Sequence, residues 1–370
     1  MKNVNKIIEK FDWVLLNQYI EEGLIMSNKH KLYDLWILNY TAKTTYENTW
    51  NDYSMACRGL VIDADGNVIA RPFIKFKNYE QHDPSEIDLD EEYEIYEKMD
   101  GSLGILFYYE VTKEWMLATR GSFQSDQAVE GMKILKDKNF NWDFLAKEYT
   151  YLWEIIYPSN RIVVNYNGLV DMSLLAIINT KTGGEVSHKA MTSVHGDYFS
   201  VVKKYELPKV NNLGDLRVHE ISNKEGFVLK FKNGFRVKVK FIEYCRLHRI
   251  VTGITSVNIW ESLMNSDSLD ELINNVPDEF YKWIKSTISD LKSAYAVIEI
   301  EALKEFVRLY FVEHKTVKKD YALAVLGHKY QSILFNMFDN KSFDFSNERY
   351  AEIIWKMVKP ERTFPFTIVE

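Results

Sequence analysis

The sequence has few cysteines and no long apolar run. Cys57 and Cys245 are the only cysteines among 370 residues, too few for a disulfide framework and outside any metal-ligand spacing. The first residues form no signal-peptide core, and no uninterrupted apolar stretch is long enough to span a bilayer. We therefore expect a protein without a membrane partner in a reducing cytoplasm, which is the host cytoplasm if the source is a virus.

Positive charge is also scarce. The 46 lysines and arginines are outnumbered by 53 aspartates and glutamates, which gives a net charge of −7. A polyanion-binding protein with this charge must gather its cations locally. Hydrophobic residues make up 46% of the chain and aromatic residues 14%, so the chain can bury a sizeable core and a disordered chain is excluded. A length of 370 residues predicts two domains.

Up to about residue 245 the hydrophobic pattern has mostly period two, with turn signals between the apolar segments. This pattern predicts hairpins over residues 60–70, 105–119 and 227–239, the last with Asn-Gly in its turn. Helices are expected at 125–136 and 142–148. The pattern therefore predicts an α+β domain that is built largely on antiparallel strands.

The pattern changes in the last third of the chain. Between Pro277 and Gly327 there is neither glycine nor proline, and apolar residues recur there at helical spacing. A final helix is expected over 350–357, ending before Pro360. The sequence therefore predicts an α+β domain over 1–245 and an all-α domain over 246–370.

Two short motifs contain candidate catalytic residues. In Glu97–Gly104 a lysine precedes Asp-Gly and small residues just before a predicted strand, so Lys98 can be displayed on a tight turn. Three fixed residues of this kind arise by chance in about one protein of this length in twenty, so a solvated loop remains an alternative. Glu154 lies in an otherwise apolar strand, where it is either exposed or buried with a partner such as a ligand hydroxyl, a cation or a metal.

The segment 225–240 is the most informative. Period two places Arg236, Lys238 and Lys240 on one strand face and apolar residues on the other, which suits a triphosphate or an RNA backbone as well as a solvated face. Glu225 is a candidate ligand for a hydrated Mg²⁺. An ideal two-residue turn pairs Lys238 with Leu229, and a bulge at a neighbouring glycine changes that register.

Taken together and in this order, the motifs resemble the covalent nucleotidyltransferase superfamily of polynucleotide ligases and messenger-RNA capping enzymes. The resemblance is strongest to the bacteriophage RNA ligase 1 family, ATP-dependent enzymes that reseal broken tRNA. It covers nearly the whole chain through the following segments: Cys57-Arg58-Gly59, Arg71-Pro72, Lys75-Phe76, Lys98-Met99-Asp100-Gly101-Ser102, Arg120-Gly121-Ser122, Glu154, Pro158–Val163, Glu225-Gly226-Phe227-Val228, Lys238-Val239-Lys240 and Asp320-Tyr321-Ala322.

The resemblance implies an antiparallel-sheet nucleotidyltransferase (ATP-grasp-like ligase) domain and a helical domain with a role in RNA specificity. It makes Lys98 the nucleophile that carries AMP, Glu225 a ligand of Mg²⁺ or Mn²⁺, and Asp270 a loosely aligned second metal ligand. The residues that it places at ATP are Arg58, Lys75, Glu97, Gly101, Arg120, Glu154, Val228, Lys238 and Lys240. Arg120 departs from the family's usual lysine, and the family's early tyrosine has no clear counterpart at Leu38 or Tyr40.

By the resemblance, Lys98 takes AMP from ATP, the AMP moves to an RNA 5′-phosphate, and an RNA 3′-hydroxyl then displaces it. A lysine amine must be neutral to attack phosphorus, and nearby cations, expected here from Lys238, Lys240 and Arg58, disfavour the ammonium. The expected partner is RNA with 5′-phosphate and 3′-hydroxyl ends, above all broken tRNA, and the protein is expected to act as a monomer. The alternatives are a capping-type guanylyltransferase, which the helical C-terminal region disfavours, and a noncatalytic RNA-binding protein with the same fold.

Overall fold

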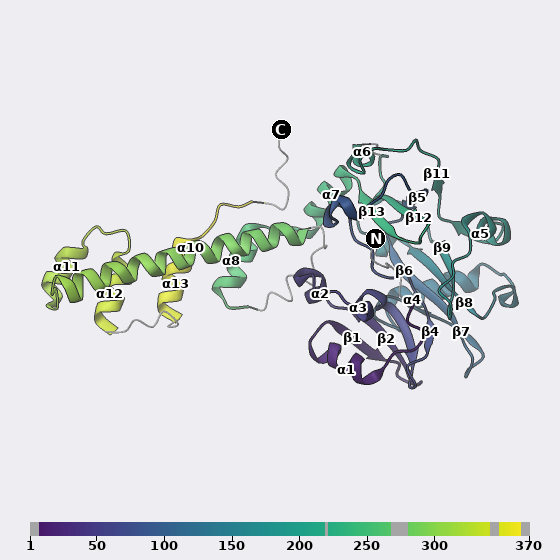
Figure 1. The fold of residues 1–370 in the computed structure, drawn as a ribbon, viewed down its shortest axis with the longest axis horizontal. Coiled ribbons are helices and arrows are strands. Elements are labelled where there is room, and N and C mark those ends of the chain that lie inside the picture. The colour runs from purple at the N-terminus through teal and green to yellow at the C-terminus, as the bar shows by residue number, and fades with distance from the viewer. Residues whose placement is uncertain (1–6, 219–220, 268–279, 341–347, 364–370) are drawn as a thin grey trace. The chain divides into compact units, whose positions relative to one another are not determined.

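The computed structural model describes residues 7–218, 221–267, 280–340 and 348–363, and the chain divides into two compact units, Met1–Val251 and Thr252–Glu370. The sequence placed this division at 245, whereas helix α7 (Ile242–Thr252) continues to the end of the first unit. In the described part of the chain, no helix combines the length and the apolar character needed to cross a membrane. Figure 1 shows the helices and strands of each unit.

The first sheet of unit 1 is four-stranded and antiparallel in the order β1-β2-β3-β4, and contains the expected hairpin at 60–70. Its strands are β1 (Ile25–Lys29), β2 (Leu35–Tyr40), β3 (Arg58–Asp63) and β4 (Val68–Ala70). Three helices accompany them in the sequence: α1 (Trp13–Glu21), α2 (Ala42–Glu47) and α3 (Asp52–Ala56). Some of its apolar side chains, including Leu38 and Leu60, pack into one core, and others, including Ile37 and Val61, pack into a second core with side chains of β6 (Ser102–Tyr109) and β8 (Tyr149–Ile156).

The second sheet of unit 1 has the order β10-β9-β8-β6-β7, and its β6–β7 pair is the expected hairpin at 105–119. Its strands are β6 (Ser102–Tyr109), β7 (Glu114–Ala118), β8 (Tyr149–Ile156), β9 (Asp171–Asn179) and β10 (Ser200–Val201). Helix α4 (Asp126–Asp137) begins at the Ser125 cap as expected, and α5 (His188–His195) precedes β10.

The helix predicted over 142–148 is wrong. Only a single 3-10 turn forms, Trp142–Phe144, and strand β8 begins at Tyr149. The backbone N–H of Ala146 donates to the Tyr151 hydroxyl instead of to a helical carbonyl. The start of β8 thus takes the hydrogen bond that a helix would need.

The third sheet of unit 1 has the order β11-β5-β12-β13, with β5 (Tyr93–Lys98), β11 (Lys204–Tyr205), β12 (Gly226–Phe231) and β13 (Arg236–Lys240). The expected hairpin at 227–239 forms, but with a three-residue loop: the Phe231 N–H donates to the Phe235 carbonyl, and Gly234 has a φ of +85°. This extra loop residue shifts the register by one from the ideal two-residue turn. Lys238 therefore pairs with Val228 rather than with Leu229.

The register decides which residues share a face of this sheet. Paired residues project to the same side, so Val228, Lys238 and Lys240 lie together. The opposite face packs into a core that includes Phe227, Leu229, Phe231, Val237 and Val239. The short helix α6 (Gly214–Val218) lies between β11 and β12 in the sequence.

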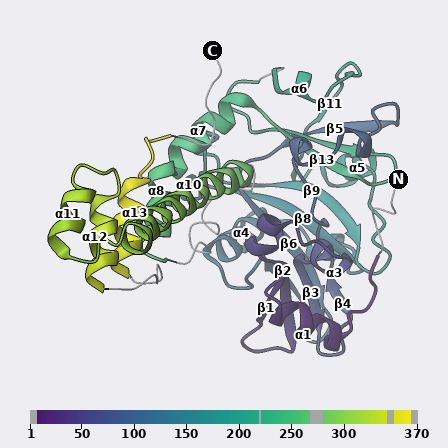
Figure 2. The same ribbon diagram turned by 60° about the vertical axis from the view of Figure 1, so that its left-hand side comes forward.

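The described residues of unit 2 form helices: α8 (Ser256–Met264), α10 (Tyr281–Val307), α11 (Lys318–Val325), α12 (Gln331–Asn340) and α13 (Glu348–Met357). Helix α10 has 27 residues, and Figure 2 shows α11, α12 and α13 beside it. Its buried residues include Ile284, Ile288, Ala302 and Phe306, as the helical spacing predicted. A π-helical turn (Arg308–Val312) follows it. The predicted fold class, α+β followed by a helical region, is confirmed.

Candidate active site

A cavity of about 640 Å³ lies within unit 1, and all three sheets contribute to its wall. The first sheet contributes Asn39 and Arg58, the second Glu154, and the third Lys98 and Lys238. The third sheet is the one whose register places its cations on the face away from the core. Residues that are far apart in the sequence therefore meet around one space.

Lys98, Gly226 and Lys240 form a row across strands β5, β12 and β13 of the third sheet. Gly226 on β12 pairs with Lys98 on β5 and with Lys240 on β13. The Glu225 carboxylate, only 3% exposed, lies 2.7 Å from the Lys98 amine and 3.3 Å from the Lys240 amine through the same oxygen. The Lys98 amine is thus ion-paired with a carboxylate, and the expected cations Arg58, Lys238 and Lys240 line the same cavity.

Glycine is required at the centre of this row. Gly226 has a φ of +153°, and a Cβ there would lie 2.1 Å from the Val239 carbonyl oxygen and 2.8 Å from the Lys240 Cα. Both atoms belong to backbone, so a side chain fits only if β13 moves away from β12. The sequence Glu225-Gly226 therefore allows the two lysines to share one carboxylate.

The turn after Lys98 is fixed by Asp100. Its buried carboxylate accepts hydrogen bonds from the Val163 and Val164 N–H groups, at 2.9 and 2.7 Å, and from the Tyr244 hydroxyl at 2.8 Å. Its own N–H donates to the Tyr166 hydroxyl. Local sequence patterns could not predict this role of Asp100, because these partners lie 63 to 144 residues away.

Gly101 and Glu154 lie close together on the wall formed by the second sheet. A Cβ on Gly101 would come within 2.6 Å of the Ile155 carbonyl oxygen and 3.2 Å of the Glu154 side chain. Glu154 is half-buried and lines the cavity. Burial, with a smaller contribution from the Glu225 charge, raises the pKa of Glu154 to about 8, although Lys98 and Arg58 oppose the shift. Glu154 can therefore hold a proton at neutral pH.

Two arginines of the predicted set also line the cavity. Burial lowers the pKa of Arg58, and its Nη1 has no hydrogen-bond partner among the described residues. The Arg120 guanidinium lies 5.7 Å from the centre of the Tyr40 ring. Val228, Lys238 and Lys240, which were also predicted to contact ATP, lie in the cavity wall as well.

Three other predicted residues are placed differently. The Lys75 amine contacts the Tyr40 hydroxyl at 3.3 Å, and Lys75 does not belong to the cavity lining among the described residues. Glu97 lines the cavity, but its carboxylate binds the Lys224 amine at 2.5 Å and the Tyr205 hydroxyl at 3.1 Å. Asp270 lies outside the described residues.

The structure also adds a residue that the sequence analysis missed. Asn39 lies on β2, is 7% exposed and lines the cavity beside Arg58, its partner on β3. A usable signal existed, because Asn39 is a polar residue in the otherwise apolar segment 35–40, as Glu154 is in its own strand. Arg236 is the third cation that the sequence places on the face of Lys238 and Lys240. Its guanidinium binds the Glu185 carboxylate at 2.5 and 2.6 Å.

The profile of a protein family described as RNA ligase matches residues 56–244. An RNA ligase of Rhodothermus phage RM378 is 23% identical over 367 residues, covering 78% of this chain and 79% of the relative. A solved archaeal ATP-dependent RNA ligase is 13% identical, with 75% of each chain covered and a TM-score of 0.46. A solved Naegleria gruberi RNA ligase is 15% identical with a TM-score of 0.41, covering 48% of this chain and 57% of the other.

Proposed function

We propose, since this chain belongs to the RNA ligase family, that it joins RNA 5′-phosphate and 3′-hydroxyl ends in a reaction that consumes ATP. The observation that carries the proposal is the row of Lys98, Gly226 and Lys240 around the Glu225 carboxylate in the wall of a nucleotide-sized cavity. Lys98 is the nucleophile of the reaction.

The proposed reaction has three steps, and each forms one bond to phosphorus and breaks another. The Lys98 amine attacks the α-phosphorus of ATP, the bond to the β-phosphate oxygen breaks, and pyrophosphate leaves while the nitrogen loses its proton. An oxygen of an RNA 5′-phosphate then attacks the same phosphorus, and the P–N bond breaks to return the lysine. Finally an RNA 3′-hydroxyl attacks the RNA phosphorus of that adenylate, loses its proton, and expels AMP.

The Lys98 amine must become available before it attacks. In the structure the Lys98 ammonium is ion-paired with Glu225 and has no lone pair, so it must both lose a proton and leave this pair before it attacks. Lys240 contacts the same Glu225 oxygen and can keep that carboxylate paired once Lys98 leaves it. Lys238, Lys240, Arg58 and Arg120 then neutralise the phosphates as negative charge develops on the leaving group.

The other residues of the cavity suit the nucleoside. Glu154 with its proton can both donate to and accept from a ribose hydroxyl. Val228 offers an apolar surface to the adenine ring, while Gly101 and Glu97 lie beside Lys98 on the turn and the strand. Lys75 reaches the phosphates only if it leaves its contact with Tyr40.

A divalent cation, Mg²⁺ or Mn²⁺, fits this site as a companion of the nucleotide. No group of three histidine, cysteine, aspartate or glutamate side chains that could hold a metal occurs in the part of the chain that the structure describes. Glu225 would therefore be one ligand, with phosphate oxygens and water supplying most of the others. When bound, such an ion neutralises phosphate charge.

A labelling experiment tests this function. The protein is incubated with α-labelled ATP and Mg²⁺, denatured, and examined for retained label, with GTP compared in parallel. We expect label from ATP on the wild type and on Lys113→Ala, a surface variant, and none on Lys98→Ala. Label that persists on Lys98→Ala would remove Lys98 from its role, and a preference for GTP would favour a capping enzyme. A folded wild type that takes up no label would favour a noncatalytic RNA-binding protein.

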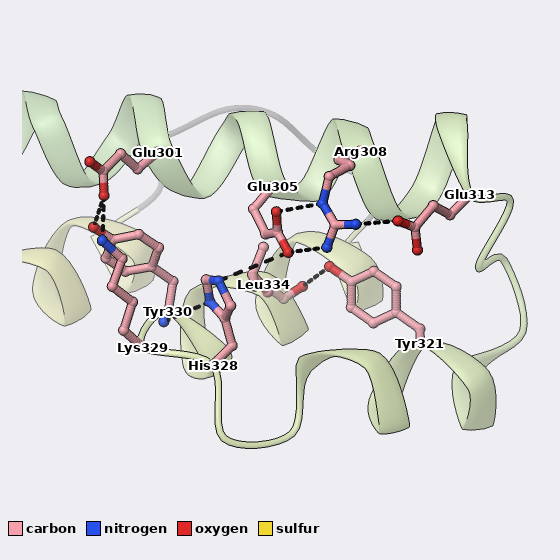
Figure 3. A network of polar contacts seen from close by, with 9 residues as sticks. All are labelled: Glu301, Glu305, Arg308, Glu313, Tyr321, His328, Lys329, Tyr330 and Leu334. Carbon is pink, nitrogen blue, oxygen red and sulfur yellow. Dashed lines mark hydrogen bonds and ion pairs between the residues drawn. The ribbon is translucent and has the colours of Figure 1, made fainter.

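The natural substrate is proposed to be broken tRNA, sealed by a monomeric enzyme. Unit 2 contains the basic residues Lys315, Lys318 and Lys319, but Lys318 is paired with Asp339 at 2.6 Å. Lys329 is likewise paired with Glu301 at 2.6 Å (Figure 3). Lys315 and Lys319 are therefore the residues to change. If unit 2 binds tRNA, the Lys315→Ala/Lys319→Ala variant should lose its preference for nicked tRNA over single-stranded RNA, whereas an unchanged preference would contradict the idea.

A further inference from the structure

Asn39 is a buried residue of the cavity wall whose side-chain oxygen has no partner among the described residues. It is 7% exposed, and its Oδ1 accepts no hydrogen bond from any residue that the structure describes. Leaving a buried polar atom unpaired costs free energy, so native proteins rarely do so without a reason. An atom of this kind in a cavity wall indicates a ligand that completes its bonding.

Arg58 shares this property with Asn39. The two residues are paired across β2 and β3, so their side chains project from the same side of that sheet. Arg58 Nη1 is also buried without a partner within the described ranges, and both residues line the cavity with Arg120. Asn39 and Arg58 of the first sheet, and Arg120, which follows strand β7 of the second sheet, thus line the same space.

The chemistry of these groups selects an anionic oxygen. An arginine can only donate hydrogen bonds. The unpartnered Asn39 Oδ1 is an acceptor to which a phosphate oxygen cannot donate, so Asn39 binds a phosphate only after its amide turns over and its NH₂ lies where the oxygen lay. A phosphate oxygen accepts bonds from both groups, and the neighbouring Arg120 adds positive charge. A hydroxyl would use the amide oxygen but would gain less from two cations.

We propose that Asn39 binds, together with Arg58, an oxygen of the pyrophosphate that leaves ATP, which makes Asn39 a further substrate-binding residue. The inference rests on the proposed function, because Lys98 must attack the α-phosphorus. The attacking and leaving groups lie roughly in line in phosphoryl transfer, so pyrophosphate departs on the side away from Lys98. Lys98 belongs to the third sheet and Asn39 to the first, which are separate groups of strands in unit 1 (Figure 1).

Two reactions separate this role from RNA binding. Adenylylation of the protein by ATP releases pyrophosphate, whereas sealing of pre-adenylated RNA does not involve it. We expect Asn39→Ala to adenylylate about tenfold more slowly at low ATP, the loss of one charge-assisted hydrogen bond. Asn39→Asp keeps the shape but repels phosphate, so a loss of about 100-fold is expected. Both variants should seal pre-adenylated RNA at nearly the wild-type rate.

The reverse reaction provides a direct probe. The AMP-loaded protein is mixed with inorganic pyrophosphate, and the ATP that forms is measured. The pyrophosphate concentration for half-maximal release should rise by about tenfold in Asn39→Ala. Asn17→Asp on α1, an exposed site, changes the net charge equally and should behave like the wild type.

The outcomes are distinguishable. A wild type that takes up no label from ATP overturns the proposed function and this inference with it. A labelled wild type with an equally labelled Asn39→Asp overturns the inference alone. Equal losses in both reactions, in variants that melt like the wild type, would place Asn39 at an RNA phosphate and also overturn it. If Asn39→Ala or Asn39→Asp does not fold, Asn39→Ser, which keeps a donor, is compared by the same two reactions.

Discussion

The polar clusters of the two units differ in how completely their members are paired. In unit 2, Glu301 accepts from Lys329 and Tyr330, while Arg308 binds both Glu305 and Glu313 (Figure 3). In the same cluster the Tyr321 hydroxyl donates to the Leu334 carbonyl. Around the cavity of unit 1, by contrast, polar atoms of Asn39 and Arg58 lack partners among the described residues.

The difference also appears in the charges. Hydrogen bonds from Arg308 lower the pKa of Glu305, because its partner stabilises the carboxylate. Burial raises the pKa of Glu154 to about 8, and within the described part of the chain no direct hydrogen bond compensates the lost hydration. A cluster whose hydrogen-bonding groups are paired with one another stabilises the fold, whereas a cluster with unpaired groups can bind a ligand. If pairing separates the two kinds of cluster, changes around the cavity of unit 1 should slow adenylylation and changes in the paired cluster of unit 2 should not.

Replacing Lys240 by Ala should have the largest effect. The change removes the second cation from Glu225, whose carboxylate is 3.3 Å away, and one charge that would face the phosphates. We expect adenylylation in a single turnover to slow by at least about 100-fold. Lys329→Ala also removes a paired lysine, but from the satisfied cluster of unit 2, and should leave this rate unchanged. Similar rates for Lys240→Ala and wild type would mean that the basic strand does not meet the nucleotide.

Replacing Gly226 by Ala should disturb the row of Lys98, Gly226 and Lys240 by displacing the backbone of β13. The new Cβ would collide with the Val239 carbonyl and the Lys240 Cα, so β13 must shift. We expect a loss of about 3 kcal/mol in the free energy of unfolding, measured with urea. Gly168→Ala is the matched control, because its φ is +80° but nothing lies within 4 Å of the added Cβ. Equal losses in the two variants would show that strain alone, without the collision, accounts for the effect.

The sequence predicted local features of this site better than its assembly. Alternating residues and Asn233-Gly234 were sufficient to predict the 227–239 hairpin, because a hairpin depends on neighbouring residues. The same pattern could not show the one-residue shift in register that the three-residue loop produces. It also could not show that β12 lies between β5 and β13, which is what brings Glu225 to Lys98, although the two residues are 127 positions apart in the sequence.

Long-range contacts also explain the errors outside the third sheet. The segment 142–148 has a helical pattern, but Ala146 bonds to Tyr151 of the following strand. Asn39 could have been singled out by the argument that was applied to Glu154, but only the structure shows that its oxygen is unpaired. Partner lists depend on tertiary packing, which periodicity does not encode.

Replacing Glu154 by Gln should change how stability depends on pH. The carboxyl has a pKa of about 8 in the folded protein and an ordinary value of 4.5. Between these values the folded state holds a proton that the unfolded state has lost, so stability falls as pH rises and levels off above 8. Linkage between these two pKa values alone gives a decline of about 4 kcal/mol between pH 5 and pH 9. Because Glu154 is only half-buried and solvent screens it, we expect about half of this decline, and Glu154→Gln should abolish it when the free energy of unfolding is measured with urea at each pH.

Glu305→Gln is the comparison for this measurement in unit 2. Because Arg308 lowers the pKa of Glu305, its stabilising effect is complete above the ordinary pKa and is lost only as the pH falls through the lowered value. Its removal should therefore leave the slope between pH 5 and pH 9 unchanged. A wild-type curve without a decline in that range, or one that Glu154→Gln does not flatten, would contradict the assignment of a protonated Glu154.

Replacing Arg308 by Ala should have the smallest effect, although Arg308 binds two carboxylates. Its side chain is 51% exposed, and exposed ion pairs contribute little because water and salt screen them. We expect a loss of no more than about 1 kcal/mol in the free energy of unfolding. The loss should be smaller still in 1 M salt, where the Debye length falls to about 3 Å and more distant charges are screened. The adenylylation rate should not change. A larger, salt-independent loss would mean that the complete cluster stabilises unit 2 strongly. Pairing alone would then fail to separate stabilising clusters from binding sites, and only the unpaired atoms of Asn39 and Arg58 would still mark the cavity.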